Sequence, residues 1–316
     1  MMGIMEASGA QQHTFRAAYT LLPESAFTAK IKTLEEILQS CVLCPRECRV
    51  DRTSGERGYC NTGDLPFISS WNPHFGEERP LVGRHGSGTI FLGNCNLGCI
   101  FCQNYTISHL GEGSEISHAK LADIMLSLQN TGCHNINFVT PTHQVPAIVN
   151  AVKLASDRGL TIPLVYNCGG YESVDTLKML DGIFDIYMPD FKYSDKRHAA
   201  NYSNAPDYPE KAKLAIKEMH RQVGDLIINQ DGIAERGLLI RHLVLPEDIS
   251  GTAEVVTFIA EEISTNTYVN IMEQYYPCYM AHRNPPLNRR ITTREYSTAL
   301  DHAIRAGLKR IDGVTV

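Results

Sequence analysis

The stretch Thr89–Cys102, TIFLGNCNLGCIFC, joins a short apolar run to three cysteines that follow it directly. The run at 89–94 is rich in β-branched and aromatic residues and predicts a strand. Cys95, Cys99 and Cys102 fall in the loop after it, with gaps of three and two residues. Three thiolates at this spacing can surround a cubane iron–sulfur cluster from one loop. Because a [4Fe-4S] cluster normally takes four cysteines, three leave one iron open, as in a catalytic metal site.

Strands and helices alternate from residue 88 onward. The apolar patterns predict strands at 89–94, 135–140, 162–167, 184–191, 238–245 and 268–274, and helices at 117–130, 145–158, 173–180, 210–223, 253–263 and 293–306. This alternation favours a parallel sheet with right-handed crossovers. Six units are too few for a closed eightfold barrel, so the α/β fold predicted is a partial (β/α)6 barrel. A doubly wound open sheet is the alternative, and both folds bind ligands at the carboxyl ends of their strands.

The composition excludes several classes of protein. The chain has 316 residues, 43% of them hydrophobic, and a formal net charge of −6. Such a charge offers no basic field for nucleic acid or acidic lipid, so neither partner is expected. Residues 1–15 lack the layout of a signal peptide and no apolar run is long enough to span a membrane, which predicts a cytoplasmic protein. In a reducing cytosol the ten cysteines are expected to be ligands or catalytic groups, not disulfides.

A second cysteine group lies near the N-terminus. A helix is expected over 26–39, and the segment 41–84 is punctuated by Gly and Pro and reads as irregular structure. It contains Cys41, Cys44, Cys48 and Cys60, a complete set of four ligands. Structural zinc and an auxiliary [4Fe-4S] cluster both accept four thiolates, and the spacing leaves these and a metal-free segment open. We therefore divide the chain into an N-terminal helix with a metal-binding module, 1–84, and a partial barrel, 85–316.

Several motifs together resemble a known family. Phe101 precedes the last cysteine of the triplet, where the radical SAM (S-adenosylmethionine) superfamily carries an aromatic residue. CNLGCIFCQNYTIS (95–108), HFGEE (74–78), GSGTIF (86–91) and CVLCPRECRVDR (41–52) are similar to homologues of the pyruvate formate-lyase activating enzyme. A similar arrangement occurs in the radical SAM members of AmmeMemoRadiSam systems. The resemblance covers about residues 40–310 and implies a barrel of the radical SAM type.

The resemblance also implies cofactor-binding residues. Phe101 belongs to the cluster motif, and the strand ending MPDFKY resembles one that places Asp190 and Lys192 near the SAM carboxylate. IRHLVLP resembles a strand whose arginine, here Arg241, meets a SAM carboxylate or ribose oxygen. The Gly-Gly-Glu segment that binds the SAM amine in activating enzymes is replaced by TPTH, beginning at Thr140, whose backbone carbonyls are candidates for that contact.

Other strand ends add candidates. His143 is a candidate contact for substrate or SAM, or else a capping residue, and Asn167 either lines the cofactor cleft or belongs to a simple turn. Glu77 and Glu78 either close over the cluster or form a solvated acidic pair.

The function implied is reductive cleavage of SAM at a [4Fe-4S] cluster, giving a 5′-deoxyadenosyl radical that abstracts hydrogen. The resemblance suggests a glycine Cα of a glycyl radical enzyme as the target, and a reductant such as flavodoxin or ferredoxin as a partner. Alternatives are modification of another peptide, an RNA or a small molecule. Outside enzymes, the triplet suits an iron–sulfur electron-transfer protein or a zinc site that borrows a further cysteine.

Overall fold

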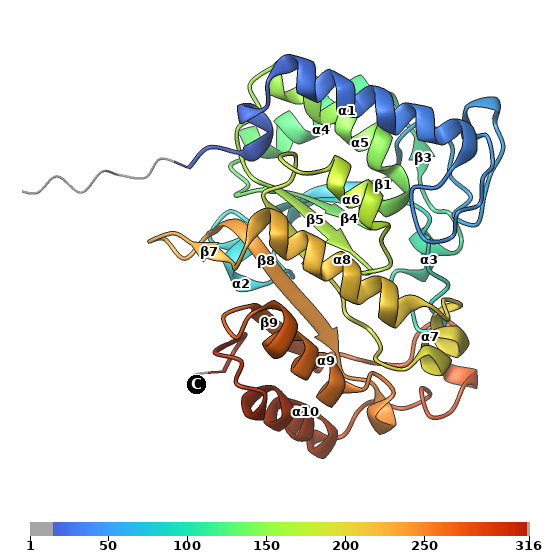
Figure 1. The fold of residues 1–316 in the computed structure, drawn as a ribbon, viewed down its shortest axis with the longest axis vertical. Helices are drawn as coiled ribbons and strands as arrows, with labels where there is room; N and C mark the ends of the chain where they lie inside the picture. The colour runs from blue at the N-terminus through green and yellow to red at the C-terminus, as the bar shows by residue number, and fades with distance from the viewer. Residues whose placement is uncertain (1–14, 315–316) are drawn as a thin grey trace, which may run out of the picture.

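One mixed sheet runs through residues 15–314, the part of the chain that the computed structural model describes (Figure 1). In these residues the sheet has ten strands in the order β10-β9-β8-β6-β5-β4-β2-β1-β3, with β7 paired to β8. The strands are β1 (Phe67–His74), β2 (Ser87–Leu92), β3 (Ser114–Glu115), β4 (Ile136–Val139), β5 (Leu164–Cys168), β6 (Ile186–Pro189), β7 (Ile227–Ile228), β8 (Ala234–Leu243), β9 (Tyr268–Met272) and β10 (Arg310–Ile311).

The helices mostly fill the connections between strands. They are α1 (Glu24–Ile37), α2 (Arg79–Val82), α3 (Tyr105–Ser108), α4 (His118–Asn130), α5 (Val145–Ser156), α6 (Val174–Met179), α7 (Lys196–Ser203), α8 (Tyr208–Val223), α9 (Thr252–Phe258) and α10 (Thr293–Arg305). Short 3-10 turns cover Ala18–Leu21, Leu38–Ser40, Arg52–Ser54, Thr142–Gln144, Pro246–Asp248 and Ala281–Arg283, and a π turn, Ile259–Ile263, continues α9.

The six parallel strands β2, β4, β5, β6, β8 and β9 neighbour one another in chain order. A doubly wound sheet would reverse its strand order partway, so that alternative is wrong and the predicted partial (β/α)6 barrel is confirmed. The sheet is not closed. Antiparallel β1 and β3 extend it beyond β2, and parallel β10 extends it beyond β9.

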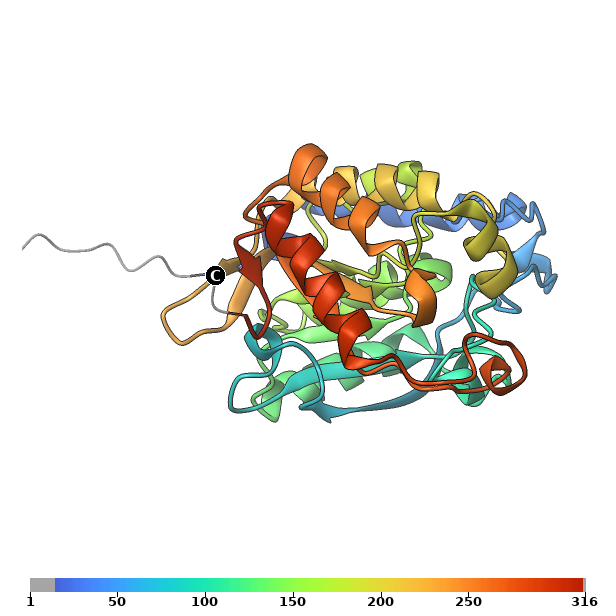
Figure 2. The same cartoon turned by 90° about the horizontal axis from the view of Figure 1, so that it is seen from below.

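Helices cover the outer face of the sheet, as Figure 1 and the view from below in Figure 2 show. α4 packs beside α5, α6 beside α8, and α9 beside α10, while α1 lies against α5. Helix α5 illustrates the reason: Val145, Ile148 and Val152 recur at helical spacing and are fully buried. Each such side chain contributes about 1.5–3 kcal/mol on burial. The helix begins at Val145 as predicted.

The segment between β1 and β2 covers part of the inner face of the sheet, which the sequence did not predict. Leu81 of α2 packs with Val165, Ile186 and Leu239, all buried, near the amino ends of the parallel strands. The segment between β1 and β2 therefore closes the lower part of the barrel with apolar side chains. The carboxyl ends of the strands are left for polar groups.

The structure corrects several predicted boundaries. β1 lies within the segment 41–84, which was expected to be irregular, because only Ile68 of its residues is buried and no alternating apolar pattern marks it. β8 begins at Ala234, before the predicted 238, because the hairpin with β7 extends it. The division at residue 84 stays a prediction.

Two predictions concern the ends of the chain and its passage through membranes. The segment 1–15, read as lacking a signal peptide, lies outside the described residues except for Phe15. Between residues 15 and 314, none of the helices combines the length and the apolar character that a membrane span requires.

Candidate active site

The cysteine triplet lies in the loop that follows β2. Asn94 adopts a left-handed conformation, with φ of 67°, and turns the chain out of the strand. The loop is then held by α7, because the Gly98 N–H donates to the Ser203 carbonyl at 3.0 Å and the Ile100 N–H to the Tyr202 carbonyl at 2.9 Å. The sheet and α7 together fix the loop at the carboxyl end of β2.

Each thiol of the triplet has a polar neighbour. The Ser203 hydroxyl donates to Cys99 Sγ at 3.0 Å, and the backbone N–H of Leu97 to Cys95 Sγ at 3.3 Å. Cys102 Sγ lies 3.1 Å from the Ser108 hydroxyl. Hydrogen-bond donors of this kind stabilise a thiolate over a thiol, which is the form that binds metal.

The electrostatics of the loop suit a cationic occupant. Burial raises the pKa of Cys95 and Cys102, and the neighbouring Cys99 thiolate raises both further, whereas Lys192 lowers them. Deprotonating all three thiols therefore requires added positive charge. Across the described range 15–314, no three His, Cys, Asp or Glu side chains already stand in the geometry of a closed metal site. Binding a cluster would have to draw the thiols together.

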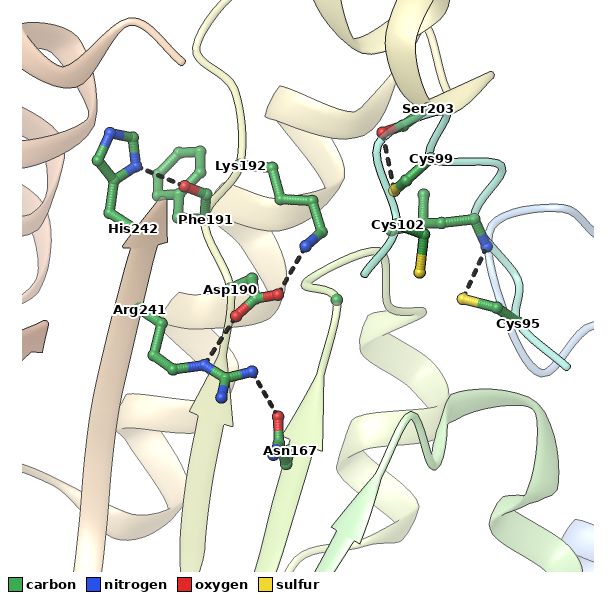
Figure 3. A network of polar contacts seen from close by, with 12 residues as sticks. Cys95, Cys99, Cys102, Asn167, Asp190, Phe191, Lys192, Ser203, Arg241 and His242 are labelled. Atoms are coloured by element: carbon green, nitrogen blue, oxygen red, sulfur yellow. Dashed lines mark hydrogen bonds and ion pairs between the residues drawn. The ribbon is translucent and has the colours of Figure 1, made fainter. Parts of the chain in front are cut away.

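A polar network occupies the carboxyl ends of β5, β6 and β8 (Figure 3). Asp190 accepts from Lys192 Nζ at 2.6 Å and from Arg241 Nε at 2.8 Å. Arg241 Nη2 also donates to Asn167 Oδ1 at 2.7 Å. In Figure 3 the Lys192 side chain lies between Asp190 and the cysteine loop. Four predicted cofactor residues therefore form one connected group.

The acidic and basic side chains of this network stay ionised. Burial alone would raise the pKa of Asp190, but Arg241 and Lys192 hold it below its ordinary value. Burial alone would lower the pKa of Lys192, but Asp190 and Cys99 hold it above its ordinary value. Both partners remain ionised, and the pair leaves Lys192 as a cation beside the cysteine loop, with Arg241 on the other side of Asp190.

The acidic pair ahead of α2 reaches the same strands. Glu77 Oε2 lies 3.5 Å from Arg241 Nη1, and Glu78 Oε1 accepts from Asn270 Nδ2 at 3.0 Å. Burial raises the pKa of Glu77 despite Arg241. These residues thus contact β8 and β9 and are not a solvated surface pair.

Three predicted cofactor residues stand apart from the network. Phe101 packs edge-on against Tyr193 and Tyr275, with ring centroids 6.4 and 6.1 Å away. Thr140 has φ of 63°, and its N–H donates to the Asn167 carbonyl at 2.8 Å, so only its backbone adjoins the group. His143 is buried, and burial lowers its pKa to about 4.

The four N-terminal cysteines share one hollow. Cys41, Cys44, Cys48 and Cys60 line it together with Arg46, Arg52 and His143. Burial raises the pKa of Cys44 to about 12, and the nearby Cys60 and Cys41 thiolates add to the rise. The four cysteines and His143 line one hollow, but no three of these side chains already stand where they could hold a metal ion.

Sequence reasoning missed several residues of these loops. Ser203 on α7 contacts Cys99, yet no motif marks it. Arg46 Nε donates to the Asn96 carbonyl at 2.9 Å and so joins the two cysteine loops. Buried Arg52 donates through Nη1 to the His143 carbonyl at 2.8 Å. The only available signal was the position of both arginines within the CVLCPRECRVDR motif.

Fold and site together define a partial β/α barrel whose first loop carries three cysteines beside a buried network of cations and carboxylates. A family model described as the radical SAM superfamily matches residues 89–235. The uncharacterized protein MJ0674 of Methanocaldococcus jannaschii is 32% identical over 292 residues, which cover 89% of this chain and 79% of that protein. The chain belongs to the radical SAM superfamily.

Two further similarities are more distant. The uncharacterized protein MJ0808 of the same organism is 22% identical over 294 residues, covering 86% of this chain and 79% of that protein. Among solved structures, the crystal structure of HydG, a maturase of the [FeFe]-hydrogenase, has a TM-score of 0.48 at 10% identity. That alignment covers 71% of this chain and 50% of the HydG chain, so the chain spans about half of its length.

Membership of the superfamily implies a [4Fe-4S] cluster and SAM. The donor set fits both groups. The cysteine loop offers three thiols with hydrogen-bond donors around them, and the strand ends offer buried cations suited to a carboxylate. Which residues hold each group stays a prediction.

Proposed function

We propose that this protein reductively cleaves SAM at a [4Fe-4S] cluster held by Cys95, Cys99 and Cys102. The observation that carries the proposal is the placement of these thiols in the loop after β2, beside the Lys192 ammonium. When bound, the cluster and SAM supply the one-electron cleavage of a C–S bond that yields a 5′-deoxyadenosyl radical.

In this proposal the chain's own residues bind SAM and orient it. Asp190 holds Lys192 and Arg241 by two ion pairs, so both cations present their remaining N–H groups at the strand ends. A carboxylate such as that of SAM binds well there, because charge-assisted hydrogen bonds are strong in a buried site. Asn167 fixes the far side of the Arg241 guanidinium. Thr140 would contribute only its backbone, and Phe101 would support the loop from its aromatic cluster.

The test is anaerobic reconstitution with iron, sulfide, SAM and dithionite, followed by measurement of 5′-deoxyadenosine. We expect its formation to require the cluster. An electron-transfer protein would hold the cluster and release no 5′-deoxyadenosine, which separates the two classes.

We further propose a glycine Cα of a glycyl radical enzyme as the site of hydrogen abstraction. The motif resemblance supports this target, and so do the exposed side chains of Tyr59 and Met280 beside the cysteine loop. Met280 adjoins the loop through a bond from its N–H to the Ile100 carbonyl at 2.9 Å. Exposed apolar groups at a site favour a macromolecular partner over a small molecule.

A deuterated peptide tests the target. A peptide copied from the radical loop of a glycyl radical enzyme, with deuterium at its glycine Cα, should transfer deuterium to 5′-deoxyadenosine. SAM cleavage without deuterium transfer would exclude this target and favour another peptide, an RNA or a small molecule. A flavodoxin or ferredoxin would supply the electron in the cytoplasm, where all ten cysteines can stay free, as they are in the structure.

We also propose that Cys41, Cys44, Cys48 and Cys60 belong to a second metal centre, either zinc or a second [4Fe-4S] cluster. The observation behind it is their convergence on one hollow. Iron and zinc analysis of protein purified without added metal separates the two, because a second cluster doubles the iron and zinc does not.

A further inference from the structure

The four-cysteine hollow contains a donor atom that the sequence does not reveal. His143 lines the hollow, and its Nδ1 is buried without a hydrogen-bond partner. A buried polar atom without a partner costs about 1–3 kcal/mol, so it points to a missing ligand or donor. Among buried side-chain atoms of residues 15–314, few share this condition.

The bonding of the ring decides what Nδ1 offers. His143 Nε2 lies 2.9 Å from the Gly93 carbonyl oxygen, which can only accept, so Nε2 carries the proton. Gln144 Nε2 lies 3.2 Å from the same ring nitrogen, but its two hydrogens are directed at the Phe67 and Gly93 carbonyls. A second proton on the ring would place an imidazolium beside the Arg52 guanidinium. The ring is therefore neutral and Nδ1 presents a lone pair.

This arrangement is the usual one for a metal-binding histidine. Ligating imidazoles almost always donate their other N–H to a carbonyl or carboxylate, which fixes the tautomer and the ring orientation. Here the Gly93 carbonyl has that role. The imidazole is thus prepared as a ligand before any metal binds.

The size of the hollow favours a single ion. About 10 Å³ of it admits a water-sized sphere, while the empty space among its atoms, which extends to solvent, is about 330 Å³. A cubane of four irons and four sulfides would have to widen the narrow part. One tetrahedral zinc ion fits the space once the thiols close around it.

The charges favour three thiolates and one imidazole. Arg52 is buried, and its Nη1 lies 3.8 Å from Cys41 Sγ. Arg46 also lines the hollow but donates to the Asn96 and Asn204 carbonyls, and Glu47 pairs with Arg49. A divalent ion with three thiolates carries one negative charge, which Arg52 balances, whereas four thiolates would leave one buried charge unbalanced.

Three of the cysteines lie close to one another. Cys41 and Cys44 are buried, and Cys60, which is half-buried as Cys48 is, lies close enough to both for their charges to interact. Cys48 is therefore the thiol left outside the set.

We infer that one zinc ion is held by Cys41, Cys44, Cys60 and His143 Nδ1. The inference rests on the second metal centre proposed above and assigns its metal and donors. It removes His143 from the SAM site and gives it a role in holding the N-terminal loop to the turn after β4.

The test is zinc K-edge X-ray absorption on the full-length protein, with zinc and iron counted in the same sample. We expect about three sulfurs near 2.3 Å and one nitrogen near 2.0–2.1 Å. His143→Gln keeps an N–H for the Gly93 carbonyl but loses the lone pair of Nδ1, so its zinc should be removed by a chelator at least tenfold more readily. His85→Gln, the same substitution at an exposed histidine outside the hollow, is the matched control and should keep its zinc.

Several results would contradict the zinc site or its histidine ligand. A shell of four sulfurs without nitrogen, or unchanged zinc retention in His143→Gln, would overturn the histidine ligand. Eight irons and no zinc, or four irons and no other metal, would overturn the zinc site. Formation of 5′-deoxyadenosine is measured separately. A negative zinc result would therefore leave the proposed SAM cleavage intact, and absence of 5′-deoxyadenosine would leave the zinc result intact.

Discussion

Asp190 is shared by two cations, and this sharing organises the candidate cofactor site. Its carboxylate lies 2.6 Å from Lys192 Nζ and 2.8 Å from Arg241 Nε, and all three side chains are mostly buried. Removing one member would leave the others with unpaired charge in a poorly solvated place. Each residue therefore positions the others, and Lys192 also faces the cysteine loop.

We predict that Asp190→Ala and Lys192→Ala each weaken SAM binding while the iron content stays near wild type. A hydrogen bond to a charged group is worth about 1.5–3 kcal/mol, which corresponds to about a ten- to hundredfold loss of affinity. Equilibrium binding of SAM to the reconstituted protein measures the effect. Lys178→Ala, which removes an exposed pair with Asp175, is the control. Unchanged affinity in both site variants would place the cofactor elsewhere.

Individual side chains were predictable where a strand carried them. Asn167, Asp190 and Arg241 were expected at the carboxyl ends of neighbouring strands, and parallel pairing brings them together. His143 follows a turn in which Thr140 has positive φ, and from there no periodicity predicts a direction. Consequently the sequence could not predict that His143 lines the four-cysteine hollow, because those cysteines lie about a hundred residues earlier in the chain.

At the scale of elements, the two cysteine loops are joined by one side chain. Arg46 donates through Nε to the Asn96 carbonyl and through Nη1 to the Asn204 carbonyl, at 2.9 and 2.6 Å. Its guanidinium also stacks 3.8 Å above the Tyr59 ring. The N-terminal loop, the cluster loop and the end of α7 thus share one contact.

We predict that Arg46→Ala loosens the cluster loop. Two hydrogen bonds and a cation–π contact disappear, each worth about 0.5–1.5 kcal/mol. The rate at which a chelator removes iron from the reconstituted protein should rise severalfold. Arg49→Ala, which removes only an exposed pair with Glu47, should leave that rate unchanged. Equal rates in the two variants would contradict a role for Arg46 in holding the loop.

Asp185, immediately before β6, ties two other segments to the sheet. Its carboxylate accepts from the Ala18 N–H at 2.7 Å and from the Leu164 N–H at 3.0 Å. Burial raises the pKa of Asp185 to about 7, above its ordinary value of 3.8. Between those values the folded protein binds a proton that the unfolded chain releases. Its contribution to the free energy of unfolding is therefore full below about pH 4 and is lost as the pH rises through about 7.

We predict that Asp185→Asn flattens this dependence, because the amide cannot ionise. The difference in thermal midpoint between about pH 5 and pH 8 should be smaller in the variant than in the wild type. Asp157→Asn, at an exposed ion pair at the end of α5, should show the wild-type difference. Parallel pH profiles for Asp185→Asn and wild type would refute the assignment.

Elements with a buried face were predictable, and those without one were not. α4 and α5 lie close to their expected ranges because their apolar residues recur at helical spacing. β1 was missed because only one of its side chains is buried. The backbone of β1 pairs with β2 and β3, and such pairing leaves little trace in the choice of side chains.

For the whole molecule, the order of the strands decides where chemistry can occur. Because the six parallel strands follow one another in chain order, their carboxyl ends meet at one rim, and the cysteine loop and the polar network both lie there. The alternation of strands and helices was enough to predict this rim. It did not predict that Glu77 would reach Arg241 from the segment before β2, because that contact joins residues far apart in the chain.

The most direct test of the central claim compares three proteins under anaerobic conditions with SAM and dithionite. They are the wild type, a variant with Cys95, Cys99 and Cys102 all changed to Ala, and Cys133→Ala, which removes a buried cysteine outside both groups. We expect the wild type and Cys133→Ala to form 5′-deoxyadenosine at similar rates and the triple variant to form none. Formation of 5′-deoxyadenosine by the triple variant would contradict the account.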